Sequence, residues 1–218
     1  MNDGDIHGII HALRENLESW GMPIVSHLAA ERRDPFEILI STLLSLRTKD
    51  EVTAAASERL FRLADTPARM LGLSEAVIAK AIYPVGFYRN KAGTIREICG
   101  ELIRRFEATV PDDIDTLLTL RGVGRKTVNL VVSLGYGKPG MCVDTHVHRI
   151  SNRLGYVSTK TPEETEFVLR AKLPRPYWTD YNTLMVTFGR QVCRPVSPLC
   201  SRCPVFRFCD RKNVVRSR

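Results

Sequence analysis

One segment decides the fold of this chain, and it reads Leu117-Leu118-Thr119-Leu120-Arg121-Gly122-Val123-Gly124-Arg125-Lys126-Thr127-Val128-Asn129-Leu130-Val131-Val132. Apolar residues recur on both sides of Gly122 and Gly124, so the segment predicts a helix, a tight glycine turn and a second helix. Glycine permits a positive φ and lets a ligand approach the backbone closely. Amides at the start of the second helix, together with its dipole, suit a phosphate group.

The charged residues beside this turn distinguish an ordinary helical corner from a turn that binds phosphate. An ordinary helical corner would need only the glycines, whereas Arg121 and Arg125 add positive charge at the place where the amides would bind phosphate. We therefore predict a helix–hairpin–helix that binds a DNA backbone without reading its sequence. Lys126 is either another cation for phosphate or a nucleophile, because the positive end of the helix dipole favours the neutral amine that nucleophilic attack requires.

A further helix start follows a glycine-containing turn at residues 135–140 and is marked by Asp144. An isolated aspartate at this position is expected to cap the helix by accepting backbone amides. His146 and His148 are two residues apart and point to different faces of a helix, so we expect structural hydrogen bonds and no metal site there. Arg149 and Arg153 lie one turn apart and suit a face that is turned toward DNA or solvent.

Four cysteines cluster near the C-terminus with the spacing C-x6-C-x2-C-x5-C, at Cys193, Cys200, Cys203 and Cys209. Thiolates so close in sequence can surround one soft metal centre, and the segment has little apolar surface with which to bury free cysteines. The spacing leaves zinc and iron–sulfur open, because it contains one C-x2-C pair and matches neither a zinc ribbon nor a bacterial ferredoxin. Cys99 and Cys142 are expected to be core residues.

The rest of the chain shows helix signals and almost no strand-like alternation, so we predict an all-α protein of short helices. Helix starts are expected at Asp34-Pro35-Phe36-Glu37 and Thr161-Pro162-Glu163-Glu164, where capping residues precede apolar runs. Further helices are expected from Asp50, from Thr66-Pro67, from Ser74, over residues 91–106 and over residues 177–188.

Bulk properties narrow the class of protein. The chain has 218 residues and a net charge of +8, which favours a polyanionic partner. The first residues lack the basic and apolar regions of a signal peptide, and no apolar run reaches the roughly 20 residues that span a bilayer. We therefore expect a cytoplasmic protein without a membrane partner, and cysteines that are reduced or bound to metal rather than in disulfides.

These elements occur together and in order: the hairpin at residues 120–127, the block from Val143-Asp144-Thr145-His146 to Asn152-Arg153, and the cysteine spacing. In this combination the chain resembles the endonuclease III family of helix–hairpin–helix DNA glycosylases, from about Pro35 to Cys209. The resemblance implies two helical domains with a DNA-binding cleft between them, a helical bundle with the hairpin at 28–138 and an iron–sulfur domain at 1–27 plus 139–218.

The resemblance also implies a cofactor and a partner. The four clustered cysteines would hold a four-iron four-sulfur cluster that is not the catalyst, and the loop at residues 194–199 would present basic residues such as Arg194 to DNA. Duplex DNA with oxidised or ring-saturated pyrimidines, or with abasic sites, would be the substrate. A monomer is the default expectation, and the DNA-bound protein would be associated with the nucleoid.

Catalytic roles follow from the same resemblance. Lys126 matches the nucleophilic lysine of the family and Asp144 matches its catalytic aspartate. The related adenine-mismatch and thymine-mismatch enzymes lack this lysine, so Lys126 favours an enzyme that removes the base and then cleaves the strand on its 3′ side by β-elimination. The target nucleotide would have to leave the base stack before either residue could reach it.

Wedge residues that fill the vacated space fall, by the resemblance, at Arg47 and Phe87. The family commonly has glutamine at the first position and leucine at the second, so lesion range and opposite-base preference are expected to differ. Phe87 or Tyr88 would stack on a base. Two alternatives stay open. The first is a glycosylase without lyase activity, and the presence of Lys126 is evidence against it. The second is a DNA-binding or redox-sensing iron–sulfur module without enzymatic activity, and the pairing of Lys126 with Asp144 is evidence against it.

Overall fold

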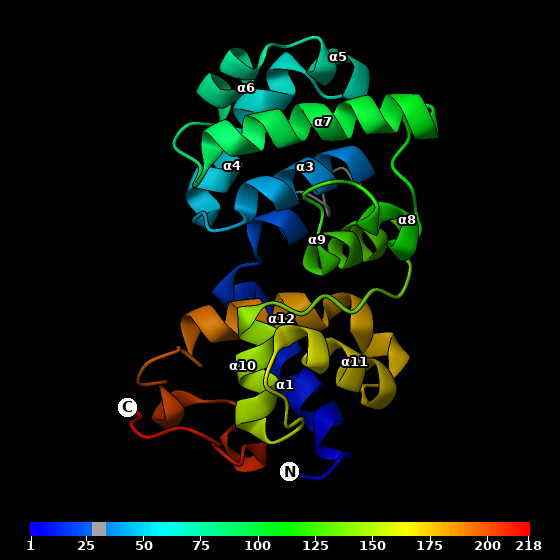
Figure 1. Ribbon diagram of the computed structural model, residues 1–218. Coiled ribbons are helices and arrows are strands. Elements are labelled where there is room, and N and C mark those ends of the chain that lie inside the picture. The colour runs from blue at the N-terminus through cyan, green and yellow to red at the C-terminus, as the bar shows by residue number, and fades with distance from the viewer. Residues whose placement is uncertain (28–33) are drawn as a thin grey trace. The chain divides into compact units, whose positions relative to one another are not determined.

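The computed structural model describes residues 1–27 and 34–218, and within them every regular element is helical (Figure 1). This confirms the predicted all-α fold. The chain divides into two compact units, one formed by Met1–Pro23 with Pro139–Arg218 and the other by Ile24–Lys138. We call them the cysteine unit and the hairpin unit. The hairpin unit thus begins at Ile24 and ends at Lys138.

The hairpin unit is built around α3 (Pro35–Ser45), which is buried on all sides from Phe36 to Leu44. Its start follows the predicted signal, because Asp34 Oδ1 accepts the amides of Phe36 at 2.8 Å and Glu37 at 2.9 Å and Pro35 takes the first helical position. A helix that is apolar around its whole circumference has to be surrounded by other elements. Neighbouring helices α4 (Asp50–Leu63), α7 (Tyr88–Phe106) and α9 (Arg125–Leu130) pack against it.

Short helices complete this unit. Thr66 caps α5 (Pro67–Leu71) and Ser74 caps α6 (Glu75–Ile82), as the sequence predicts, and both helices pack on α7. Asp113 caps α8 (Ile114–Leu118), which precedes the hairpin turn. A π-helical turn, η1 (Val131–Gly135), continues α9 into the core and contacts α3.

The cysteine unit is centred on α12 (Trp178–Gln191), in which Tyr181 and Phe188 are fully buried. Helices α1 (Asp5–Trp20) and α10 (Thr145–Leu154) pack against α12, and α11 (Pro162–Lys172) packs against α10. Three short 3₁₀ helices also belong to this unit. They are η2 (Arg175–Tyr177), η3 (Cys200–Arg202) and η4 (Phe206–Phe208). Of the helices that the structure describes, none combines the length and the apolar composition needed to cross a membrane.

Unpaired hydroxyls inside the hairpin unit give a stability prediction. Thr42 on α3 is fully buried, and among the described residues its Oγ1 has no hydrogen-bond partner. Valine has nearly the same shape without the hydroxyl, so Thr42→Val should stabilise the protein by about 1 kcal/mol and raise Tm by roughly 2–4 °C. Thermal unfolding followed by circular dichroism measures this change.

Thr53 on α4 provides the matched control, because it is equally buried but its Oγ1 donates to the Lys49 carbonyl at 3.0 Å. Thr53→Val should give no increase in Tm, since it removes a hydrogen bond. An equal rise in Tm for both variants would show that burial of a methyl group, and not the unpaired hydroxyl, determines the effect.

Candidate functional site

The hairpin turn joins α8 to α9 in the hairpin unit, as the sequence predicts. Gly122 has φ of 79°, and a Cβ there would lie 2.7 Å from Thr94 Cγ2, so both backbone conformation and space require glycine. Gly124 occupies the N-cap position of α9 in extended backbone, and nothing within 4 Å would obstruct a Cβ there. The structure therefore assigns different roles to the two glycines, one to the turn and one to an open surface at the helix start.

Lys126 is the second residue of α9 and is partly buried beside Arg125. The helix is fully buried from Thr127 onward, so only its first turn lies near the surface. First-turn amides have no partner within the helix and can bind an anion. The π-helical turn that follows α9 fixes the helix in the core, and π turns are often found near functional sites.

The two arginines of the hairpin differ in their surroundings. Arg121 is exposed and forms an ion pair with Glu97 of α7 at 3.2 Å. An exposed pair of this kind is worth about 0–1 kcal/mol, so it is weak enough to exchange for a phosphate. Arg125 is partly buried at the first position of α9.

Asp144 lies in the cysteine unit, where it caps α10. Its Oδ1 accepts the amides of His146 at 2.8 Å and Val147 at 2.9 Å. The capping interpretation is therefore correct locally, and the cap fixes the position of a partly buried carboxylate at the helix start.

The two histidines after Asp144 take part in structural hydrogen bonds, as predicted. His148 Nδ1 lies 2.7 Å from Thr165 Oγ1, which ties α10 to α11, and His146 Nδ1 lies 3.2 Å from a guanidinium nitrogen of Arg149. Among the described residues no group of histidines, cysteines and acids is arranged to hold a single metal ion. The histidines thus support the helix that carries Asp144.

Arg149 and Arg153 are less exposed than the sequence suggests. Arg149 is partly buried, its Nη2 donates to the Cys193 carbonyl at 2.9 Å, and desolvation lowers the pKa of its guanidinium. Arg153 is 8% exposed, so the expectation that it faces DNA or solvent is wrong. Its guanidinium donates to Cys193 Sγ at 3.4 Å and to the carbonyls of Arg194 at 2.8 Å and Pro195 at 3.0 Å.

The four clustered cysteines line one cavity in the cysteine unit, together with Arg153 and apolar side chains that include Phe188, Leu199 and Val205. Burial is the main cause that raises the pKa of the Cys203 thiol, to about 12, and it also raises the pKa of Cys209. These thiols would be protonated at neutral pH unless a cation compensated their charge. A bound metal centre supplies that compensation, so the donor set suits soft metal chemistry.

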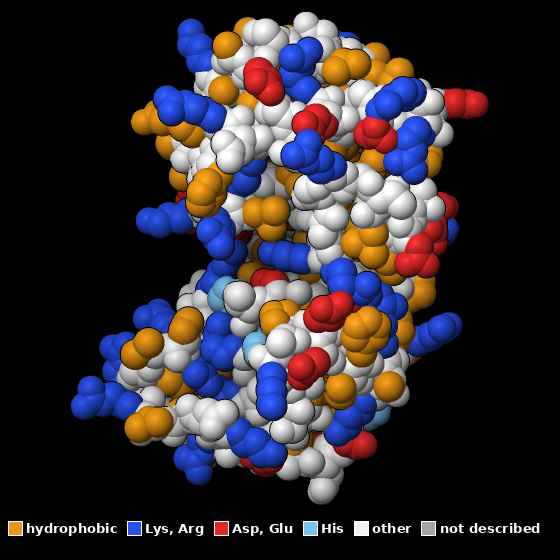
Figure 2. Space-filling model, viewed as in Figure 1, with side chains coloured by type: hydrophobic (Ala, Val, Ile, Leu, Met, Phe, Trp, Pro, Cys, Tyr) orange, Lys and Arg blue, Asp and Glu red, His pale blue; other side chains and the backbone are white. Residues whose placement is uncertain are grey.

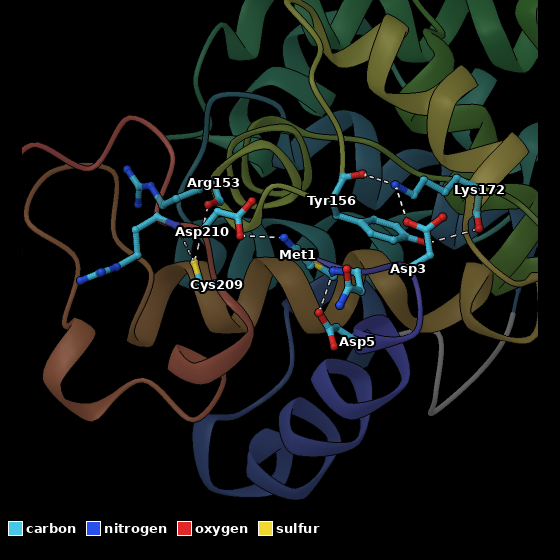
Figure 3. Close-up of polar contacts among 10 residues, drawn as sticks. Met1, Asp3, Asp5, Arg153, Tyr156, Lys172, Cys209 and Asp210 are labelled. Atoms are coloured by element: carbon cyan, nitrogen blue, oxygen red, sulfur yellow. Dashed lines mark hydrogen bonds and ion pairs between the residues drawn. The ribbon is translucent and has the colours of Figure 1, made fainter.

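Hydrogen bonds hold both ends of this cysteine segment on the end of α10. Arg153 contacts Cys193 with its side chain, and its carbonyl accepts from the Lys212 amide at 3.0 Å and from the Cys209 thiol at 3.6 Å. Figure 3 shows Arg153, Cys209 and Asp210 together, with Asp210 Oδ1 2.7 Å from the Met1 backbone nitrogen. The buried arginine therefore organises the segment, a role that no sequence pattern had indicated.

Basic side chains gather on the surface of this segment. Arg194, Arg202, Arg207 and Arg211 are all exposed, and Figure 2 shows Lys and Arg side chains concentrated over it. Arg194 thus presents its side chain to solvent while its carbonyl is held by Arg153. Cys99 and Cys142, by contrast, are fully buried, as expected for core residues.

The predicted wedge residues lie on two adjacent loops of the hairpin unit. Arg47 follows α3, and Phe87 and Tyr88 lie at the start of α7. Arg47 and Phe87 are exposed, whereas Tyr88 is partly buried and its ring meets that of Tyr83 edge-on at 5.3 Å. An exposed phenylalanine beside a cation is the kind of side chain that can insert between bases.

Comparison with known proteins identifies the family. Residues 40–175 match the HhH-GPD superfamily of base excision DNA repair proteins. Endonuclease III of Thermotoga maritima is 48% identical over 177 residues, which cover 81% of this chain and 83% of that protein. Endonuclease III-like protein 1 of Mus musculus is 43% identical over 171 residues, and the match spans 57% of its length.

Solved structures agree with this relationship. A non-covalent endonuclease III–DNA complex superposes with a TM-score of 0.86 at 33% identity and covers 97% of this chain and 96% of its own. A thermostable thymine-DNA glycosylase shares the fold, with a TM-score of 0.75 at 24% identity, 86% coverage of this chain and 92% of its own. The chain therefore belongs to the endonuclease III family within the HhH-GPD superfamily, and it is a base excision repair enzyme of the DNA glycosylase and AP lyase class.

Proposed function

We propose that Lys126 is the nucleophile with which this enzyme removes oxidised pyrimidines from duplex DNA and cleaves abasic sites, and that Asp144 assists the attack. The observation that carries this proposal is the position of Lys126 in the accessible first turn of α9, directly after the hairpin. A related solved structure is a trapped endonuclease III–DNA covalent intermediate, which requires a nucleophile on the protein. The enzyme would act as a monomer on the DNA of the cytoplasm.

The proposed reaction needs only groups of this chain, the DNA and water. The neutral amine of Lys126 attacks C1′ of the deoxyribose, and the bond from C1′ to the base breaks, so that the base leaves with the bonding electrons. Loss of one amine proton leaves an aminal at C1′. The C1′–O4′ bond then breaks, O4′ takes up a proton, and the opened sugar carries an iminium at C1′, which makes the C2′ proton acidic. Removal of that proton breaks the C3′–O bond on the 3′ side, and water finally hydrolyses the imine and regenerates the lysine.

Asp144 contributes negative charge at the reacting carbon. A carboxylate can stabilise positive charge that develops on the sugar, or accept the proton that the attacking amine loses. Because the cap bonds fix Oδ1, the charge is held in place without reorganisation during the reaction. The hairpin amides, Arg121 and Arg125 would bind phosphates on the strand and present the lesion to these groups.

The four clustered cysteines would hold a four-iron four-sulfur cluster. Their thiols line one cavity, and burial raises the pKa of Cys203 and Cys209, so a cationic centre would be needed to hold them as thiolates. Four cysteine thiolates are the ligand set of such a cluster. When bound, the cluster would supply structural cross-links, and the protein residues around it would fix the loop that carries Arg194 for contact with DNA.

A trapping experiment tests the nucleophile. With borohydride and duplex DNA that contains an abasic site or thymine glycol, the wild-type protein should form a covalent complex, and Lys126→Ala should form none. Lys138→Ala is the matched control, because Lys138 is an exposed lysine of the same unit. An unimpaired trap in Lys126→Ala would overturn the assignment, and cleavage that appears only after alkali would indicate a glycosylase without lyase activity.

The charge of Asp144 can be separated from its capping role. Asparagine is an equally good N-cap, so Asp144→Asn should retain the amide bonds of α10 and leave Tm within about 1 °C. Loss of the negative charge should lower the single-turnover rate of base removal by roughly 10²- to 10⁴-fold. Equal activity of wild type and Asp144→Asn at saturating DNA would restrict Asp144 to the structural role.

The cofactor has an optical test that does not depend on activity. Protein purified without oxygen should contain iron and sulfide and absorb near 400 nm, approximately as expected for such clusters. Cys203→Ser should reduce this absorbance, whereas Cys142→Ala, at a buried cysteine of the same unit, should retain it. A colourless protein that contains zinc would contradict the cluster and leave the proposed glycosylase chemistry standing.

A further inference from the structure

Two exposed side chains of the hairpin unit adopt the same unusual backbone conformation. Arg47 has φ of 55° and Phe87 has φ of 58°, both in the left-handed region that residues other than glycine seldom occupy. A bulky residue stays in this region only where the surrounding structure determines its conformation. Both side chains are directed to the surface, and Phe87 is 61% exposed.

The two side chains contact each other. The central carbon of the Arg47 guanidinium lies 5.5 Å from the centroid of the Phe87 ring, within the range of a cation–π interaction. This contact joins residues that are forty positions apart and come from different loops.

The backbones of the two loops are in contact as well. The Gly86 amide donates to Thr48 Oγ1 at 3.1 Å, and Thr48 Oγ1 donates to the Leu46 carbonyl at 3.2 Å. A Cβ at position 86 would lie 2.6 Å from the Arg47 carbonyl oxygen, so only glycine permits this approach. The loops therefore form one packed element directly beneath the Arg47–Phe87 pair.

Lys91, in the first turns of α7, connects this element to α3. Its Nζ donates to the carbonyls of Leu44 at 2.9 Å and Leu46 at 2.7 Å, which belong to the end of α3. Carbonyls at a helix end lack partners within the helix, so a lysine can satisfy them. Burial lowers the pKa of Lys91 to about 8, which shows that its amine is withdrawn from solvent to make these bonds.

A second cation holds the other side of the element. Arg59 of α4 is exposed, and it donates through Nε to the Ala81 carbonyl at 2.8 Å and through Nη2 to the Tyr83 carbonyl at 2.6 Å. The segment that leads into Phe87 is thus fixed at its start by Arg59, and the loop of Arg47 is fixed by Lys91. Both cations are engaged with backbone carbonyls of the element.

We propose that Arg47 and Phe87 act as one coupled wedge in base flipping, and that Lys91 is the positioning residue that holds their two loops together. The proposal rests on the proposed function, in which the enzyme removes a base from duplex DNA. A stacked arginine and phenylalanine lose less conformational entropy on insertion than two independent side chains would lose, because the contact already restricts both of them. The wedge then fills the space left by the flipped nucleotide as a single aromatic and cationic surface.

A double-mutant cycle tests the coupling. Arg47→Met and Phe87→Leu each remove the cation–π contact. Each should lower the single-turnover rate of cleavage of a thymine-glycol duplex by about two- to fivefold or more, which is the effect expected from loss of an exposed cation–π contact. The double variant should be no slower than the slower single variant, because the second substitution removes nothing further from the pair. A double variant whose defect equals the product of the two single defects would overturn the proposal.

Arg105→Met is the matched control for loss of an arginine–aromatic contact. Arg105 lies 4.8 Å above Phe106 at the other end of α7, and its loss should leave duplex cleavage unchanged. A defect equal to that of Arg47→Met would show that any such loss on α7 impairs the enzyme.

Lys91→Met tests the positioning role. It should lower duplex cleavage by about tenfold, as expected for lost charge-assisted hydrogen bonds, and the Arg47–Phe87 coupling should disappear in its background. Single-stranded abasic DNA has no duplex from which a base must be flipped, so the ratio of borohydride trapping on duplex to trapping on single-stranded abasic DNA should fall in Lys91→Met relative to the wild type. Persistent coupling in Lys91→Met would refute the positioning role.

The single-stranded substrate also separates this inference from the proposed function. If wild-type protein fails to form the trapped complex on single-stranded and duplex abasic DNA, the nucleophile assignment fails. If trapping succeeds on both while the cycle is multiplicative, only the coupled wedge fails.

Discussion

The amides of a helix's first turn have no partner within the helix, and this structure uses that constraint twice. In α9 the helix is buried from Thr127 onward, so its first turn and Lys126 remain together near the surface of the hairpin unit. In α10 Asp144 Oδ1 accepts two of the first-turn amides. One helix start thus carries an amine and the other carries a carboxylate, and the proposed chemistry needs one of each.

The cysteine segment depends on a different interaction, the burial of a single guanidinium. A buried arginine is stable only when its donors are satisfied, and Arg153 meets this requirement with a thiol and two backbone carbonyls of the segment that begins at Cys193. Its own carbonyl binds the segment again near Cys209. The arginine therefore adds polar anchoring to a segment whose Cys193 and Val205 side chains lie in the hydrophobic core, and it leaves Arg194 exposed.

Cations that donate to backbone carbonyls have a similar role in the hairpin unit. The half-buried Lys91 and the exposed Arg59 each bind two carbonyls at helix ends, and together they fix the two loops that carry Arg47 and Phe87. Burial of Lys91 costs desolvation energy, so its hydrogen bonds have to be well formed to offset it. In both units, therefore, a cation bound to backbone carbonyls fixes loops that carry exposed side chains.

Local sequence patterns were enough to predict the helical class, most helix starts, the hairpin and the residues that resemble a catalytic pair, because capping residues, glycines and apolar periodicity act over a few neighbouring positions. Asp34, Thr66, Ser74 and Asp144 cap the helices that they were expected to cap. The roles of Arg153 and Lys91 and the contact between Arg47 and Phe87 became visible in the folded chain alone. Each of these depends on groups 40 or more positions away, and nothing in a local pattern distinguishes a cation that will be buried from one that will face solvent.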